Sequence, residues 1–276
     1  MSTLIELLKS GEEYLLDSGI EDAKTDAWQL LSHVFKIDRI YFLINQQEKV
    51  DKRLYNNYIE LILQRSKKTP LQYIIGHVEF MGINIKVTKD VLIPRQETEI
   101  LVNKVLEVSS NKTVLDMCTG SACIIVSLAK LGNILKGVGV DISAQALEVA
   151  RKNAQNNGVD IDFIQSDLFN NINDKFDIIV SNPPYIPTLD IEELMPEVRE
   201  NEPRIALDGL EDGLDFYRRI INQLDYYLNE QGHIFFEIGY NQGLDVYNML
   251  IDKKFKEVEI IKDLSGFNRI VHAVKI

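Results

Sequence analysis

The tetrapeptide Asn182-Pro183-Pro184-Tyr185 holds the residues best suited to chemistry in this chain of 276 residues. It follows the apolar, β-branched run 176–180, which predicts a buried strand that delivers the tetrapeptide into a loop at its carboxyl end. Each proline fixes its own φ and holds the preceding residue extended, so we expect a stiff loop. Such a loop can present an amide side chain, a backbone carbonyl and an aromatic ring in fixed positions.

This combination suits the recognition of a planar amino group on an sp² carbon. The side-chain oxygen of Asn182 and the carbonyl of Pro183 can each accept one of its two hydrogens, while Tyr185 stacks on its plane. The nitrogen of such a group is a poor nucleophile, and acceptors that hold both hydrogens favour positive charge on it. We therefore interpret Asn182, Pro183 and Tyr185 as candidates for catalysis. The alternative is a structural Pro-Pro turn in which Asn182 has no chemical role.

Strand and helix patterns alternate from about Lys112 onward, which favours an open, mainly parallel sheet with helices on both faces. We expect the tetrapeptide to follow the fourth strand, and three later strands to close the sheet with an antiparallel edge. In such sheets ligands bind at the carboxyl ends of the strands, where the strand order reverses. The expected strands are residues 113–117, 136–141, 161–164, 176–180, 233–238, 257–261 and 269–274.

The turn 118–122, which follows the first strand, has one glycine, Gly120, and lacks both a full G-x-G-x-x-G and a phosphate-binding lysine. Asp141 closes the next strand, where an acid can bind ribose hydroxyls, and Asp167 follows the third, where it can accept from an adenine amino group. A ligand with adenine and ribose but no phosphate fits this set best, and S-adenosylmethionine is such a ligand. Taken singly, each acid is more often a solvated strand end.

The amino-terminal part, residues 3–69, has a helical pattern throughout. Thr3 and Glu6 can form a capping box, and Pro70 ends the last helix. We expect further helices from Asp22 to Phe35, after Asp38, and from Asp51 to Ser66. On periodicity alone this bundle is as consistent with structural packing as with partner recognition.

Residues 72–87 alternate in a way that predicts a β-hairpin, which includes Tyr73-Ile74-Ile75. The expected organisation is a helical substrate-recognition domain over 1–69, a β-hairpin linker over 70–92 and a catalytic domain over 93–276. A helix is expected from just after Pro94 to Leu106. Its first residues, Arg95, Glu97 and Glu99, fit a solvated helix start slightly better than a ligand site.

The net charge of −12 disfavours nucleic acid as a stable partner and favours a basic protein. No apolar run approaches membrane-spanning length, so we expect a cytoplasmic protein, and we expect a monomer. Cys118 and Cys123 fit that compartment as free thiols. The four histidines lack ligand spacing, so no metal site is expected.

With these residues in place, the chain resembles the class I methyltransferases, which are S-adenosylmethionine-dependent and Rossmann-like with a seven-stranded, mainly parallel sheet. It resembles most closely the HemK/PrmC family, which methylates the side-chain amide of a glutamine in peptide chain release factors. The resemblance runs nearly end to end through the stretches 70–74, 93–99, 181–186, 202–204 and 206–209. It implies that the substrate is the Gly-Gly-Gln glutamine of class 1 release factors, held by Asn182, Pro183, Pro184 and Tyr185. It also implies cofactor contacts from Cys118, Thr119, Gly120, Ser121, Ala122, Asp141, Asp167, Leu168 and Asn182.

The sequence departs from the family at Cys118, Ala122 and Leu210, where glycines are usual. Side chains at Cys118 and Ala122 restrict the backbone angles of the turn and its approach to a ligand, so they bear on the conformation of the loop and on cofactor affinity. If Cys118 lies near a helix amino terminus, its thiol should ionise readily and react in the absence of cofactor.

Three alternatives remain. An adenine amino-methyltransferase for DNA or RNA would use the same active-site logic, but the acidic chain shows no basic cluster or target-recognition insert. A ribosomal-protein glutamine methyltransferase is a closer rival that this chemistry does not exclude. A non-enzymatic, adenosyl-binding regulator would leave the stiff loop unexplained.

Overall fold

The computed structural model describes residues 2–276, which divide into two compact units. One unit contains the described residues up to Gly76 and a short later segment, Met195–Asn201. The other contains His77–Leu194 and Glu202–Ile276. The helical unit is therefore formed by two separate stretches of the chain, and the second stretch interrupts the sequence of the other unit. No helix within residues 2–276 has the length and apolar character needed to span a bilayer.

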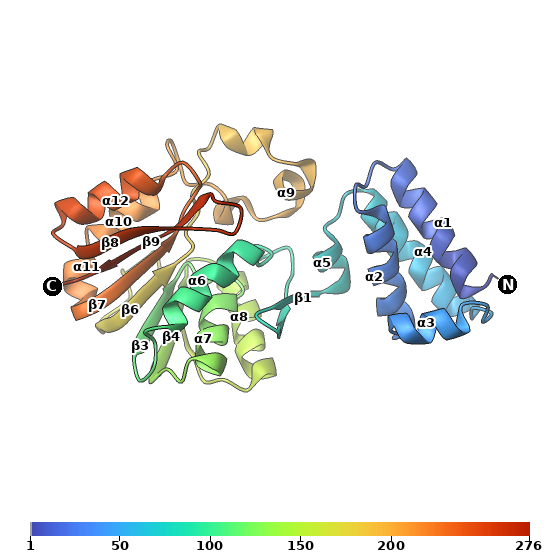
Figure 1. Cartoon of the computed structure of the whole chain (residues 1–276), viewed down its shortest axis with the longest axis horizontal. Coiled ribbons are helices and arrows are strands. Elements are labelled where there is room, and N and C mark those ends of the chain that lie inside the picture. Colours follow the sequence, from blue (N-terminus) through green and yellow to red (C-terminus); the bar gives the residue numbers. More distant parts are fainter. Residues whose placement is uncertain (1) are drawn as a thin grey trace. The chain divides into compact units, whose positions relative to one another are not determined.

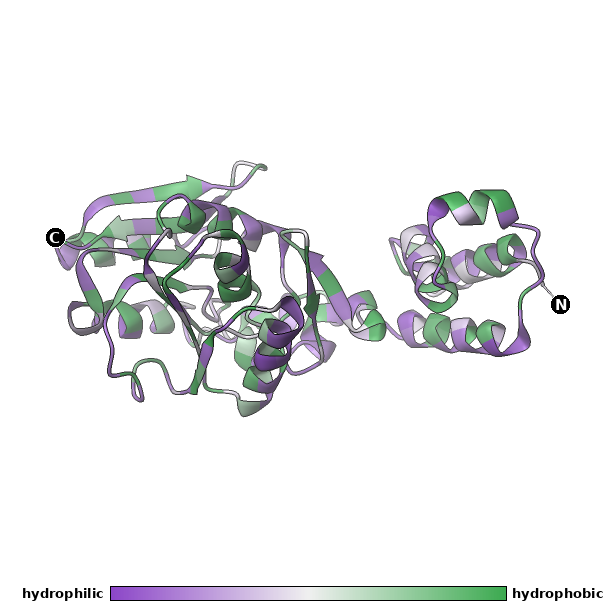
Figure 2. Cartoon of the chain, turned by 90° about the horizontal axis from the view of Figure 1, so that it is seen from below, coloured by the Kyte–Doolittle hydropathy of each residue, from purple (hydrophilic) through white to green (hydrophobic). Residues whose placement is uncertain are grey.

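The first unit is helical (Figure 1). Purple and green residues alternate along its helices in Figure 2, as amphipathic packing requires, and Leu15, Leu31 and Tyr58 are fully buried. The expected capping box is confirmed, since Thr3 and Glu6 each bond the other's backbone nitrogen. Its helices are α1 (Leu4–Asp17), α2 (Ala23–Phe35), α3 (Arg39–Asn45), α4 (Lys52–Ser66), α5 (Leu71–Ile75) and α9 (Pro196–Asn201).

Helix α5 corrects one prediction, because residues 72–75 were expected to belong to the hairpin. Pro70 precedes the helix with φ −53°, and Gly76 ends it in the left-handed conformation with φ +87°. These two caps select a helical turn despite the β-branched residues between them. The predicted hairpin is confirmed only for β1 (His77–Phe80) and β2 (Ile83–Lys86), which pair antiparallel.

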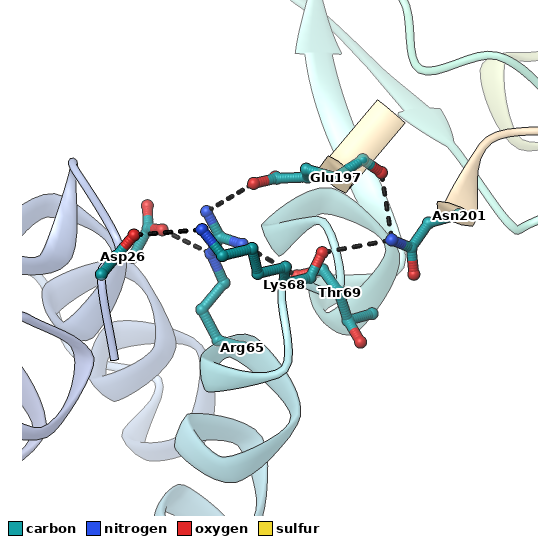
Figure 3. Close-up of polar contacts among 7 residues, drawn as sticks. Asp26, Arg65, Lys68, Thr69, Glu197 and Asn201 are labelled. Atoms are coloured by element: carbon teal, nitrogen blue, oxygen red, sulfur yellow. Dashed lines mark hydrogen bonds and ion pairs between the residues drawn. The ribbon is translucent and has the colours of Figure 1, made fainter. Parts of the chain in front are cut away.

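Arg65 connects the parts of the helical unit (Figure 3). Its Nε lies 2.6 Å from a carboxylate oxygen of Asp26 in α2, and its Nη2 lies 3.0 Å from Glu197 in α9. Its Nη1 donates to the carbonyl of Thr69 at 3.2 Å. Asn201, also in α9, donates to the carbonyl of Lys68 at 3.2 Å. Both Arg65 and Asp26 are buried, so this cluster is part of the packed interior.

The second unit is an α/β domain built on a seven-stranded sheet of order β5-β4-β3-β6-β7-β9-β8. The first five strands of that order run parallel, and β9 is antiparallel to both of its neighbours, as the sequence predicted. The strands are β3 (Thr113–Met117), β4 (Lys136–Asp141), β5 (Asp162–Gln165), β6 (Phe176–Ser181), β7 (Leu228–Glu237), β8 (Lys256–Lys262) and β9 (Asn268–Val274).

Helices cover both faces of this sheet (Figure 1). On one face, Leu115 and Met117 of β3 share a buried cluster with Tyr217 and Leu250, which come from α10 and α12. The other face carries α6, α7 and α8. The helices of this unit are α6 (Gln96–Leu106), α7 (Cys123–Leu131), α8 (Ala144–Asn157), α10 (Asp215–Ile221), α11 (Leu224–Tyr227) and α12 (Gly243–Asp252), with single 3₁₀ turns at Asp190–Glu193 and Arg204–Ala206.

Candidate functional site

The strand order reverses at β3, which has β4 on one side and β6 on the other. The carboxyl ends of these parallel strands meet at one edge of the sheet, and a cavity of about 560 Å³ lies there. The sequence placed its candidate residues at these strand ends, and most of them line this cavity. They are Cys118, Gly120, Ser121, Asp141, Asp167, Leu168, Asn182 and Pro184.

The turn after β3 is held by two carboxylates. The N–H of Gly120 donates to Asp141 at 2.9 Å, and the hydroxyl of Thr119 donates to Asp116 at 2.6 Å. Burial raises the pKa of Asp141, although bonds from the backbone of Ser143 and Gly120 oppose that effect. Thr119 and Ala122, which the sequence also offered as cofactor contacts, are buried and do not line the cavity.

The three unusual positions share one backbone conformation. Cys118, Ala122 and Leu210 have φ of +63°, +63° and +68°, in the left-handed region that glycine occupies without strain. Gly120, between the first two, has φ +54°, and a Cβ there would meet no atom within 4 Å. The turn therefore keeps the shape that glycines favour, at a cost in backbone strain.

The expectation of a readily ionised Cys118 thiol is wrong. Helix α7 begins five residues later, at Cys123, and Ala122 caps it in the left-handed conformation. Burial and the neighbouring carboxyl groups of Asp141 and Asp116 raise the pKa of the Cys118 thiol. Both cysteines are free thiols, as predicted.

The charges of the cavity fit a ligand without phosphate. It is lined by three arginines, and each is paired with a carboxylate: Arg95 with Glu202 at 2.5 Å, Arg219 with Asp167 at 2.6 Å, and Arg204 with Asp208 at 3.4 Å. None of them is an unneutralised cation that could grip a phosphate. Asp141 adds a carboxylate that is bonded to the backbone N–H groups of Gly120 and Ser143 rather than to one of these arginines, which suits a cationic sulfonium ligand.

The tetrapeptide follows β6 directly. Asn182 is half-buried, and its Nδ2 donates to the hydroxyl of Thr98 at 3.4 Å. Pro183 and Pro184 are buried, and Tyr185 packs on the core cluster, where burial raises its pKa to about 12. Asn182 and Pro184 line the cavity, whereas Pro183 and Tyr185 lie beside it. Stacking of Tyr185 on a substrate remains a prediction.

Several residues that support this loop were not singled out from the sequence. Gln242 donates to the carbonyl of Tyr185 at 2.9 Å and fixes the end of the tetrapeptide. Glu237 is fully buried at the end of β7, and Thr98 is buried beside Asn182. Arg95, which the sequence favoured slightly as a solvated residue, lines the cavity and pairs with buried Glu202. Glu237 could have been noticed in the sequence, because it is an acid within the apolar run 233–238.

Comparisons with known proteins agree in both units. The family model described as PrmC N-terminal domain matches residues 6–76, and the methyltransferase small domain matches residues 96–197. The release factor glutamine methyltransferase of Geobacter sulfurreducens is 40% identical over 98% of this chain and 95% of its own. The protein of the same name from Clostridium acetobutylicum is 41% identical over 91% of this chain and 90% of its own.

Solved structures with the same fold are more distant in sequence. A methyltransferase from Pyrococcus furiosus matches 71% of this chain and 90% of its own with a TM-score of 0.55 at 17% identity. A 16S rRNA methyltransferase of T. Thermophilus, in complex with AdoMet and guanosine, matches 72% of this chain and 50% of its own with a TM-score of 0.51 at 18% identity. These likenesses support the class I methyltransferase fold that the sequence predicted.

Proposed function

This chain belongs to the family of release factor glutamine methyltransferases, and we propose that its substrate is the glutamine of the Gly-Gly-Gln motif in class 1 peptide chain release factors. The methyl donor is S-adenosylmethionine, which supplies an electrophilic methyl group on a sulfonium. The observation that carries the proposal is that Asn182 lines the same cavity as Gly120, Asp141 and Asp167. An amide-binding residue and the candidate cofactor residues thus border one space.

The residues of the chain bind and orient the reactants. The acidic groups Asp141 and Asp167 suit the ribose and amino groups of the donor, and the turn around Gly120 leaves room for it. Asn182 Oδ1 and the Pro183 carbonyl each accept one hydrogen of the substrate amide. These two bonds would fix the orientation of the nitrogen toward the donor. A bound donor would supply its methyl carbon to this nitrogen, with the carbon–sulfur bond breaking as the nitrogen–carbon bond forms, and the nitrogen would then release one proton.

We assign substrate recognition to the helical unit, over residues 1–69 and the helices that pack with them. The support is that this unit matches a domain specific to the family, whereas the α/β unit has the general methyltransferase fold. The net charge of −12 supports a basic partner and electrostatic attraction to it. A monomer that acts in the cytoplasm, with no stable nucleic-acid partner, is part of the same proposal.

The test is transfer of labelled methyl from S-adenosylmethionine to an intact release factor, with the modified residue located by mass spectrometry. The expected product is a single methyl group on the motif glutamine. A release factor with that glutamine replaced by alanine is the matched control and should take up no label. Ribosomal protein and duplex DNA, offered under the same conditions, test the two rival enzymes. Label on DNA adenine, with none on the release factor, would replace the proposal by the adenine amino-methyltransferase.

A further inference from the structure

Glu237 is a buried acid behind the tetrapeptide that the chemistry described so far does not use. It ends β7, whose neighbour β6 ends at Ser181, opposite Phe236, so Glu237 lies beside Asn182 at the same edge of the sheet. Its side chain interacts with the side chains of Thr98 and Asn182. Only 1% of the residue is exposed, and its Oε2 has no hydrogen-bond partner within residues 2–276. Burying an acid in this way is costly, which calls for a reason.

The donor and acceptor groups of Glu237, Thr98 and Asn182 determine which end of the Asn182 amide faces inward. An ionised carboxylate only accepts, so the single hydroxyl proton of Thr98 is donated toward Glu237. The Thr98 oxygen is then an acceptor, and it takes a bond from Asn182 Nδ2 at 3.4 Å. The amide of Asn182 must therefore turn its nitrogen inward and its oxygen toward the cavity. This conclusion follows from the donor and acceptor capacity of the three side chains.

We propose that Glu237 is a positioning residue that, together with Thr98, keeps the oxygen of Asn182 turned toward the cavity as a hydrogen-bond acceptor. This rests on the proposed function, in which that oxygen accepts a hydrogen from the substrate amide. A flipped Asn182 would present its own NH₂ to the NH₂ of the substrate, and two donors would face each other. Neutral Glu237 can donate and so permits the flipped arrangement, which makes the ionised form the active one.

The surroundings of Glu237 bring the pKa of its carboxyl close to neutral pH. The pKa of Glu237 is raised to about 7. Burial is the largest cause and Glu97 of α6 adds to it, whereas bonds from Thr98 and Asn182 and the charge of Arg269 on β9 oppose the rise. The other titratable groups that face it are Tyr185, Tyr217 and Cys123, whose pKa values are all raised. All three are neutral near pH 7, so the switch rests on Glu237.

The test compares the parent with Glu237→Gln, which keeps the shape of the side chain but can offer either a donor or an acceptor. We expect kcat for release factor methylation to fall roughly 10- to 100-fold, less than the 10²–10³ of removing a transition-state contact outright. S-adenosylmethionine affinity should stay within about twofold. The parent kcat should rise with pH through about 7, and this rise should be absent in the variant. Glu230→Gln, the same change at a 69% exposed side chain on the same strand, should behave as the parent.

Each outcome decides between the alternatives. An inactive parent enzyme overturns the proposed function itself, whereas an active parent whose kcat and pH profile match those of Glu237→Gln overturns only the role of Glu237. If Glu237→Gln does not fold, Thr98→Val serves in its place, since it breaks the same chain of bonds and should lower kcat without changing cofactor affinity. A Thr98→Val enzyme with parent kcat, or a parent kcat that is flat between pH 6 and 8, roughly one unit either side of the Glu237 pKa, would also overturn the inference.

Discussion

The guanidinium of Arg65 lies 3.0 Å from the carboxylate of Glu197, so a residue of α4 is paired with a short helix that the chain forms only after β6. The same guanidinium neutralises Asp26, whose carboxylate is buried with it. The amino-terminal helices thus hold α9, which lies in the segment between the tetrapeptide and β7.

Replacing Arg65 with methionine should destabilise the helical unit by about 3–5 kcal/mol, because Asp26 would be left buried without its cation. Trp28, the only tryptophan of the chain, lies in α2 and makes denaturant unfolding of this unit visible by fluorescence. Glu197→Gln should cost less than about 1 kcal/mol, since that carboxylate is 29% exposed. Adding Asp26→Asn to Arg65→Met should recover part of the loss. Equal stability of Arg65→Met and the parent would show that the cluster contributes little.

Asn182→Ala should lower the turnover of release factor methylation by roughly 10²–10³, because one preorganised contact to the reacting nitrogen is lost. Cofactor affinity, measured separately by calorimetry, should change far less, which would separate the substrate role from the cofactor role. Asn222→Ala, at an exposed position after α10, is the matched control. Turnover within a few fold of the parent would show that Asn182 has only a structural role in the turn.

Asp141→Ala should weaken S-adenosylmethionine binding by about 1–3 kcal/mol, the cost of leaving buried polar partners unpaired. One of those partners is known, since the N–H of Gly120 donates to Asp141 at 2.9 Å. Asp141→Asn keeps an acceptor for that N–H and should lose less affinity. Asp174→Ala removes an exposed acid from the same unit and should leave binding unchanged in calorimetry. Unchanged affinity in Asp141→Ala would remove this residue from the cofactor site.

The sheet was largely predictable because its strands are short, β-branched and bounded by turn formers, as in β3 and β4, whose observed limits match the expected ones. The error at residues 72–75 arose because Ile74 and Ile75 favour strands, while the caps Pro70 and Gly76 decide the conformation of so short a segment. The strand-end residues Asp141 and Asn182 were found because parallel strands bring their carboxyl ends together. Contacts such as that of Arg65 with Glu197 could not be predicted, because the two residues are far apart in the sequence and nothing in the residues around either one indicates its partner.

The left-handed conformation of Leu210 offers a direct test of the strain at the three unusual positions. Leu210→Gly should stabilise the protein by about 0.5–1 kcal/mol, because the relief of strain outweighs the added freedom of the unfolded chain. The Leu210 side chain is 48% exposed, so little packing is lost. Gly158→Ala, at φ +66° with no atom near its Cβ, is the reverse change and should cost about 1 kcal/mol. Thermal unfolding measures both, and a less stable Leu210→Gly would contradict the strain argument.

Asp116 should make the protein less stable as pH rises, the opposite of the usual effect of a paired carboxylate. Its carboxyl is fully buried, its Oδ1 has no partner within residues 2–276, and burial raises its pKa to about 7. The folded protein therefore holds this proton at pH values where the unfolded chain has lost it. The resulting stability is present below the unfolded pKa near 4 and is lost as pH rises through about 7.

Asp116→Asn removes this charge while keeping an acceptor for the hydroxyl of Thr119, which donates to Asp116 at 2.6 Å. At pH 8 we expect the variant to be more stable than the parent by about 4 kcal/mol, and the difference should shrink as pH falls and vanish below the unfolded pKa near 4. Asp177→Asn is the control of opposite sign, because bonds from Thr113 and Asn229 lower the pKa of Asp177 despite partial burial. That variant should be less stable than the parent at pH 7, with the gap closing as pH falls. Urea unfolding across this pH range measures both, and an Asp116→Asn protein less stable than the parent at pH 8 would show that the buried charge is compensated.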